Sequence, residues 1–240
     1  MSAATKHWLF CMLVFGLIAS SCDPAAAVQL VSASGSSFPA KLGGSGDSGL
    51  SIISKDGRYV LFASTANNLT LTNNNNSVLP CRFNVFLRDR ISQTTTLVSV
   101  NQNGTGGGNG DSFPAGISTN GQFALFESSA SDLVANDTNN ASDIFVRNLI
   151  NGTTTLMSVS TSGGNASGAS RGSVMTPNGR YVAFVCMASN LVAGDTNNIP
   201  DVFIRDLQAS TIKRVSLGSS PANYSTLLSS SESPEITPDG

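Results

Sequence analysis

Residues 176–184 read Thr-Pro-Asn-Gly-Arg-Tyr-Val-Ala-Phe, and residues 201–206 read Asp-Val-Phe-Ile-Arg-Asp. In the first stretch an Asx-Gly pair leads into a short apolar run, which favours a two-residue β-hairpin turn whose central residues both have positive φ. The second stretch is a further run of strand length, rich in β-branched and aromatic residues. Together they predict antiparallel strands, and they decide the fold because the chain contains them more than once.

Both stretches recur at intervals of about 60 residues. The glycine of the Asx-Gly pair recurs at Gly57, Gly121, Gly179 and Gly240, and residues 84–89 and 143–148 are counterparts of residues 201–206. Each copy adds one strand before the Asx-Gly pair, and each of the first three copies adds one after the second stretch. The expected first strands are Leu50–Ser54, Ala115–Thr119, Ser173–Thr176 and Pro234–Thr237, and the expected last strands are Thr95–Val100, Thr154–Val159 and Thr211–Ser216.

Tandem copies of four short antiparallel strands, without helical periodicity after the first 22 residues, are typical of the blades of a β-propeller. We therefore predict an all-β fold over residues 46–240, with three complete blades and the start of a fourth. The repeats run over about residues 46–110, 111–169, 170–228 and 229–240. Because propellers close with about 4 to 8 blades, we expect the chain to be a fragment of a longer propeller or to close by association.

The repeats resemble the WD40-like PD40 repeats of TolB-type bacterial propellers. Residues 176–184 and 201–207 carry the resemblance, which extends over residues 46–240. In the first two copies the proline of the turn is replaced by Lys55 and Thr119. The resemblance implies a propeller fold and periplasmic protein partners.

The first 22 residues have the layout of a secretory signal peptide. Lys6 and His7 precede an apolar run over residues 9–19, which is shorter than the roughly 20 residues needed to span a bilayer. Small residues then lead to Cys22, which would be lipidated in a bacterial lipoprotein, while residues 25–27 offer an ordinary Ala-x-Ala cleavage site. We expect residues 23–45 to be a linker and lead-in strand. The protein is expected to be exported to the periplasm or outside the cell, attached to a membrane only through a lipid on Cys22.

The composition excludes several functional classes. Charged residues make up 12% of the chain and the formal net charge is -2, which argues against nucleic-acid binding. The only histidine, His7, lies in the predicted leader, so the mature chain lacks the base of a Ser-His-Asp or Cys-His apparatus. After the predicted leader only Cys81 and Cys186 remain, which are too few for a four-cysteine metal site. They are either separate thiols or a disulfide. We predict no catalytic residue, and no cofactor unless calcium binds.

Two loops contain oxygen ligands with the spacing of part of a calcium loop. A calcium loop also has a glycine at position 6 and a glutamate at position 12, which both loops lack. The alternative is that these side chains hold tight turns through hydrogen bonds to the backbone. The predicted ligands are Asp137, Asn139 and Asp143 in the second copy, and Asp195, Asn197 and Asp201 in the third.

Three further features have both a structural and a functional interpretation. Arg88, Arg147 and Arg205 recur in every copy, each followed by Asp or Asn, which favours a charge-assisted hydrogen bond at the strand end. Glu127 has no counterpart in the other copies, and it is either a solvated strand end or a general acid. An insertion in the first copy contains residues 80–82, and it is either a partner-binding loop or a neutral one.

These observations favour a non-catalytic, exported propeller that binds a protein or a surface polymer in the bacterial envelope. The alternative is the propeller part of a secreted hydrolase whose catalytic residues lie beyond residue 240.

Overall fold

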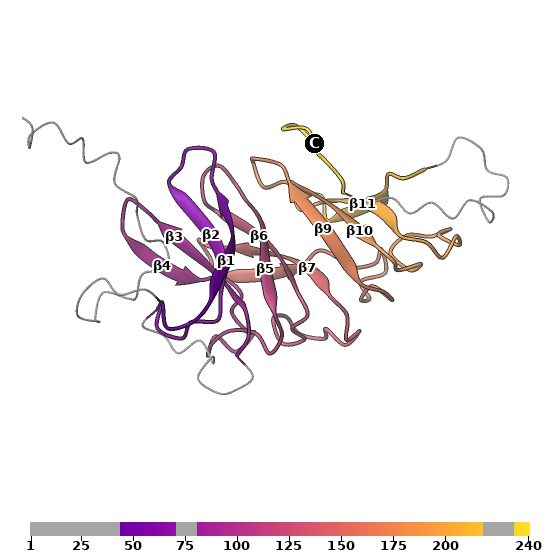
Figure 1. Ribbon diagram of the computed structural model, residues 1–240. Coiled ribbons are helices and arrows are strands. Elements are labelled where there is room, and N and C mark those ends of the chain that lie inside the picture. Colours follow the sequence, from indigo (N-terminus) through magenta and orange to yellow (C-terminus); the bar gives the residue numbers. More distant parts are fainter. Residues whose placement is uncertain (1–43, 71–80, 218–232) are drawn as a thin grey trace, which may run out of the picture. The chain divides into compact units, whose positions relative to one another are not determined.

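The computed structural model describes residues 44–70, 81–217 and 233–240 (Figure 1). These residues form three antiparallel sheets of four strands each, and in every sheet neighbouring strands follow one another in chain order. The predicted all-β fold, with three complete blades, is therefore confirmed. The blades consist of β1 (Ser48–Ile53), β2 (Tyr59–Ser64), β3 (Asn84–Asp89) and β4 (Thr94–Leu97); β5 (Ser112–Ile117), β6 (Phe123–Ser128), β7 (Asp143–Asn148) and β8 (Thr153–Leu156); and β9 (Ser170–Met175), β10 (Tyr181–Cys186), β11 (Asp201–Asp206) and β12 (Thr211–Arg214).

The turn at the Asx-Gly pair differs from the predicted two-residue hairpin. Gly57 has a φ of 72°, whereas Asp56 is not among the residues with positive φ. The amide of Gly57 donates to Ser54 O (2.8 Å), and Asp56 Oδ1 accepts hydrogen bonds from the Ser54 hydroxyl (2.6 Å) and the Arg58 amide (3.1 Å). These bonds keep the aspartate in a right-handed turn, so only the glycine needs the left-handed conformation.

The first strand of each blade begins earlier than predicted. β1, β5 and β9 each contain a register shift against the second strand, which marks a β-bulge. A bulge inserts one residue and breaks the alternation of side chains, so the sequence pattern reveals only the part after it.

The last strands end earlier than predicted, because serine side chains replace backbone partners. The hydroxyl of Ser99 accepts a hydrogen bond from the Val85 amide (3.0 Å), and the amide of Val100 donates to Val98 O (2.8 Å) in a tight bend. Ser158 and Ser216 accept in the same way from Ile144 and Val202.

Each sheet has a phenylalanine pair at its centre, one ring on the second strand and its register partner on the third. The ring centroids lie 5.5 to 6.0 Å apart, and all six rings are buried. The pairs are Phe62 and Phe86, Phe126 and Phe145, and Phe184 and Phe203.

Apolar side chains of neighbouring sheets share common cores. One buried cluster joins Leu125 and Ile144 of the second blade to Val182 and Phe184 of the third. A second cluster joins side chains of the first and second blades, among them Leu61 and Phe126. The blades therefore cover one another's apolar faces, as expected for propeller blades.

The repeated glycines also bring the blades close together. A Cβ built on Gly121 would lie 2.3 Å from the Tyr59 ring, and one built on Gly179 would lie 2.4 Å from the Phe123 ring. Gly240 is related to Tyr181 in the same way, at 2.3 Å. Each of these glycines thus meets the aromatic residue that begins the second strand of the preceding blade, and the turn of the fourth copy lies on the third blade.

Backbone hydrogen bonds between blades add to this packing. The amide of Ser112 donates to Phe83 O (2.8 Å), and the amide of Ser170 donates to Ser142 O (2.7 Å), so successive blades use equivalent atoms.

The turn of the fourth copy is present, with the Gly240 amide donating to Thr237 O (3.1 Å). The prediction of a strand over Pro234–Thr237 is wrong, because these residues form no ladder with another strand among those described.

The predicted leader, including Cys22, lies outside the described residues, as does nearly all of the predicted linker. Within residues 44–70, 81–217 and 233–240, no helix has the length and apolar character needed to cross a membrane.

Candidate functional site

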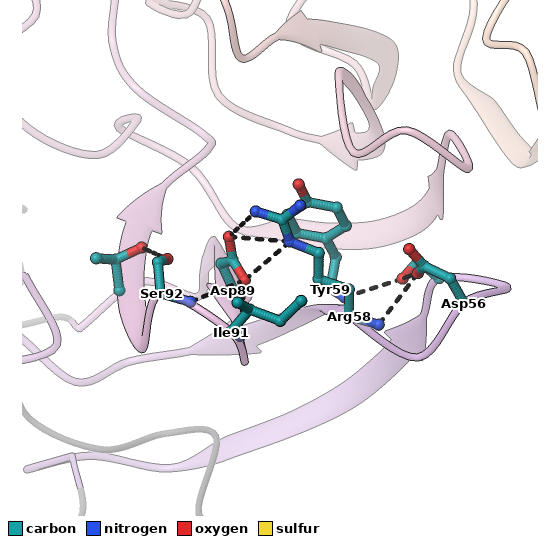
Figure 2. Close-up of polar contacts among 8 residues, drawn as sticks. Asp56, Arg58, Tyr59, Asp89, Ile91 and Ser92 are labelled. Carbon is teal, nitrogen blue, oxygen red and sulfur yellow. Dashed lines mark hydrogen bonds and ion pairs between the residues drawn. The ribbon is translucent and has the colours of Figure 1, made fainter.

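One end of the blades contains the turns at residues 54–58, 89–93, 118–122, 148–152, 176–180 and 207–210, and we call it the turn end. In the first blade an ion pair holds two of these turns together (Figure 2). Arg58 donates from both Nε and Nη2 to the carboxylate of Asp89, with a shortest distance of 2.7 Å, and its guanidinium lies 4.7 Å from the centroid of the Tyr59 ring. These hydrogen bonds from Arg58 hold the pKa of Asp89 well below its usual value.

The third blade repeats this arrangement and the second lacks it. Arg180 binds Asp206 through Nε and Nη2 and lies over Tyr181, and the bond lowers the pKa of Asp206 to about 2. In the second blade Gln122 and Asn148 take the corresponding positions. The arginine after the Asx-Gly pair therefore forms a charge-assisted hydrogen bond at the strand end in addition to those of the recurring arginines, for which such a bond was predicted. That pattern, Asx-Gly-Arg in two of the copies, was the signal in the sequence.

The recurring arginines of the third strands have other partners. Arg88 Nη1 donates to the Thr95 hydroxyl (3.1 Å), and Arg147 Nη1 donates to the Thr154 hydroxyl (2.9 Å). The position equivalent to these threonines in the third blade is Ile212, which is the register partner of Arg205.

Because Ile212 cannot accept a hydrogen bond, Arg205 Nη1 donates to Val159 O of the second blade instead (3.0 Å). Burial lowers the pKa of both Arg147 and Arg205.

Glu127 connects two blades. Its Oε1 accepts hydrogen bonds from the amide (2.8 Å) and the hydroxyl (3.0 Å) of Ser173 on β9. Both sequence interpretations, a solvated strand end and a general acid, omitted this bond between blades.

The predicted calcium ligands of the second blade lie near one another. Asp143 is fully buried, and its carboxylate accepts hydrogen bonds from Ser158 Oγ (2.5 Å) and Asn139 Nδ2 (2.7 Å). Asp137 is 7% exposed, and burial together with the charge of Asp143 raises its pKa to about 6. A cation near the two carboxylates would relieve this electrostatic cost.

The third blade already holds a cation at the corresponding place. Arg214 Nη1 lies 2.9 Å from Asp195 Oδ1 and 3.4 Å from Asp201 Oδ2. Its equivalent in the second blade is Leu156, because Phe145 pairs with Leu156 and Phe203 pairs with Arg214. Asn197 donates to Asp201, as Asn139 does to Asp143. The change from leucine to arginine was visible in the sequence, but its connection to the acidic loop was not.

The part of the chain that the structure describes contains no group of three or more His, Cys, Asp or Glu side chains that could hold a metal ion. Calcium binding would therefore depend on amide or backbone oxygens beside the two carboxylates, and it stays a prediction. Cys81 is exposed and Cys186 is buried, and they do not form a disulfide. Of the predicted partner-binding insertion, residues 71–80 lie outside the described residues.

A cavity of about 370 Å³ opens at the turn end between the second and third blades. It could not be predicted from the repeats, because it depends on the spacing between two sheets. Its walls include the apolar side chains of Phe123, Val146, Met157 and Leu207. Polar side chains complete it: Asn148, Thr153, Thr155, Asn178, Arg180, Arg205, Gln208 and Ser210.

The polar side chains of this cavity present hydrogen-bond donors. Asn148 Oδ1 accepts from the amides of Ile150 (3.0 Å) and Asn151 (3.4 Å), and Asn178 Oδ1 accepts from the Arg180 amide (2.9 Å) and the Thr176 hydroxyl (2.7 Å). Within the described ranges, the Nδ2 groups of both asparagines and the Nε and Nη2 groups of Arg205 have no hydrogen-bond partner. The cavity therefore favours a ligand that accepts hydrogen bonds.

Comparisons with known proteins give matches in fold alone. No family model and no curated protein matches the sequence. A structure described as TolB from Agrobacterium tumefaciens is 18% identical, with a TM-score of 0.43 over 72% of this chain and 46% of that one. The β-propeller domain of the trilobed protease from Pyrococcus furiosus is 13% identical, with a TM-score of 0.43 over 70% of this chain and 41% of that one. This chain therefore spans less than half the length of either structure.

Proposed function

We propose that this chain is a non-catalytic, exported propeller segment that binds a protein or a surface polymer of the bacterial envelope through its turn end. One observation carries the proposal: the cavity between the second and third blades gathers side-chain donors that are not used within the described part of the molecule. Concave sites with apolar walls and a few convergent polar groups are the usual form of ligand sites.

The other reactive side chains favour binding over catalysis. Asp89 and Asp206 are paired with arginines, and Asp143 and Glu127 accept hydrogen bonds from serines. These contacts hold strands and blades together. The ion pairs of Asp89 and Asp206 are equivalent contacts within the first and third blades, and such repetition is typical of structural contacts in repeat proteins. A catalytic group needs instead to reach a substrate.

The turn end also presents apolar side chains to solvent. Ile91 and Ile150 occupy equivalent turns of the first and second blades and are 74% and 77% exposed. The turn of Ile150 lies between Asn148 and Thr153, which line the cavity, and exposed apolar side chains near such a site are suited to contact with a partner. Export is supported by the layout of residues 1–22, which resembles a signal peptide.

In vivo photo-cross-linking with cell fractionation tests this function. The full chain is produced in a Gram-negative host with a photoreactive amino acid at position 150, or at position 187 as the control. Met187 is also exposed (54%) but directly follows β10 at the other end of the blades. We expect an exported protein with an envelope adduct from position 150 alone. A protein that stays in the cytoplasm, or equal adducts from both positions, would contradict the proposal.

A further inference from the structure

We propose that the cavity between the second and third blades binds a small carboxylate attached to an apolar body, with Arg205 as the group that recognises the carboxylate. This proposal deepens the binding function proposed above and depends on it. The chemical class of the ligand follows from three properties of the cavity: its charge, its hydrogen-bond donors and its apolar walls.

The charge of the cavity comes from Arg205. Arg180 also lines it, but its guanidinium is neutralised by Asp206 (2.8 Å). Arg205 is half-buried, and its one hydrogen bond among the described residues is to the backbone carbonyl of Val159. A half-buried cation without a counter-ion is electrostatically costly, so an anion in the cavity would be stabilised.

The difference between blades shows why Arg205 is free to bind a ligand. In the first two blades the equivalent arginine donates to a threonine of its own sheet, whereas Ile212 leaves Arg205 turned toward the second blade. Arg205 lines the cavity and Arg147 does not. In the third blade, isoleucine replaces the threonine that would accept a hydrogen bond from Arg205 within its own sheet. This is also the blade whose arginine lines the cavity.

The donors favour a carboxylate over other anions. Arg205 Nε and Nη2 form the fork that binds the two oxygens of a carboxylate, and the Nδ2 groups of Asn148 and Asn178 add neutral donors. One unpaired guanidinium balances one negative charge. A doubly charged phosphate would keep an unpaired charge in a half-buried site, which is unfavourable.

The walls favour an apolar body. Phe123, Val146, Met157 and Leu207 line the cavity, and its volume of about 370 Å³ lies within the usual range for small-molecule sites. The carboxyl terminus of a peptide that ends in an apolar residue has this chemistry. The sugar acid of a polymer shares the carboxylate but presents hydroxyl groups to these walls.

Isothermal titration calorimetry of the full chain at pH 7.5 tests the proposal. The probes are N-acetyl-L-leucine, its amide N-acetyl-L-leucinamide, D-glucuronate and inorganic phosphate. We expect N-acetyl-L-leucine to bind at least about tenfold more tightly than its amide, because the amide cannot form the charge-assisted hydrogen bonds. We expect it to bind more tightly than glucuronate or phosphate as well.

Three variants locate the site. Arg205→Gln is expected to weaken binding of N-acetyl-L-leucine at least about tenfold. Ile212→Thr retains the charge but gives Arg205 the partner that Arg88 and Arg147 have, and it is expected to weaken binding several-fold. Lys213→Gln removes one positive charge from an exposed neighbour and is expected to change nothing. Thermal melts of each variant confirm that it is folded.

Equal affinity for N-acetyl-L-leucine and its amide, or unchanged affinity in a folded Arg205→Gln variant, would overturn the proposal. Tighter binding of glucuronate or phosphate would show that the ligand class is wrong. If these results accompany a persistent envelope adduct at position 150, the binding function stands and only the ligand assignment fails. Loss of that adduct would instead contradict the binding function itself.

Discussion

The ring of Phe123 lies against Gly179, so close that a Cβ on the glycine would be 2.4 Å from the ring. Gly179 also has a φ of 77°. Two independent features therefore require a glycine here: the positive φ of its turn, and the close contact with the aromatic ring of the preceding blade. Gly57 separates these two requirements, because it has a φ of 72° but its Cβ would lie 3.8 Å or more from other atoms.

Substitution of these glycines by alanine should have unequal effects. Gly57→Ala is expected to destabilise the protein by about 1 kcal/mol through the left-handed backbone alone. Gly179→Ala adds a clash with Phe123 and should cost at least about 2 kcal/mol more. Urea denaturation measures both. Equal losses in the two variants would show that the contact between Gly179 and Phe123 is absent.

This contact illustrates what could be predicted from the sequence. The repeats revealed the number of strands and their order, and the third strands were predicted with the correct ends at residues 84–89, 143–148 and 201–206. The Asx-Gly pair correctly located the turn. The predicted type of turn was wrong, because the Asp56 carboxylate accepts hydrogen bonds from the Ser54 hydroxyl and the Arg58 amide. These local bonds are not part of the Asx-Gly pattern.

The site was harder to predict than the fold. The cavity depends on how two sheets are placed, and no periodicity in the chain reports that placement. The replacement of threonine by Ile212 was visible when the copies are aligned, but its effect on Arg205 requires the register of β11 and β12. The bond between Glu127 and Ser173 likewise joins residues of different blades.

Replacing Arg214 by leucine should destabilise the third blade. The variant Arg214→Leu reproduces the leucine of the second blade and leaves two carboxylates, each with a side chain 3% exposed, without their cation. Loss of one partner of a buried ion pair costs about 3 to 5 kcal/mol. The free energy of unfolding at pH 7.5 measures the loss, and Lys213→Leu removes the same charge from an exposed position as the control. A similar, small loss in both variants would contradict the role of Arg214.

The stability of the second blade should fall as the pH rises. The pKa of Asp137 is raised to about 6, above the usual value of 3.8, so the unfolded chain releases its proton first. As the pH rises from about 4 to about 6, the free energy of unfolding therefore falls by up to about 3 kcal/mol. Asp137→Asn should remove this contribution, so the variant should gain stability over the wild type at pH 7.5 and much less at pH 4.

Urea denaturation at both pH values, with a calcium chelator present, measures the effect of Asp137→Asn. Asp47→Asn is the control, because Asp47 is exposed. Curves for Asp137→Asn and the wild type that stay parallel across this pH range would show that Asp137 does not titrate as described.

Calcium, if it binds, should act through the second blade. Arg214 already occupies the space between Asp195 and Asp201, whereas Leu156 leaves Asp137 and Asp143 without a cation. Added calcium should therefore raise the melting temperature of the wild type and of Asp195→Asn, but not of Asp137→Asn. A melting temperature of the wild type that is unchanged by calcium and by chelator would exclude the calcium prediction.

The central claim is that successive blades pack face to face and share equivalent hydrogen bonds. Hydrogen exchange at the Ser112 and Ser170 amides tests it most directly, because these amides donate to Phe83 O and Ser142 O of the preceding blades. If the blades pack as described, both amides exchange as slowly as those inside β6 and β10. Exchange of both at the rate of an unprotected amide, while β6 and β10 remain protected, would show that the sheets fold without packing against one another.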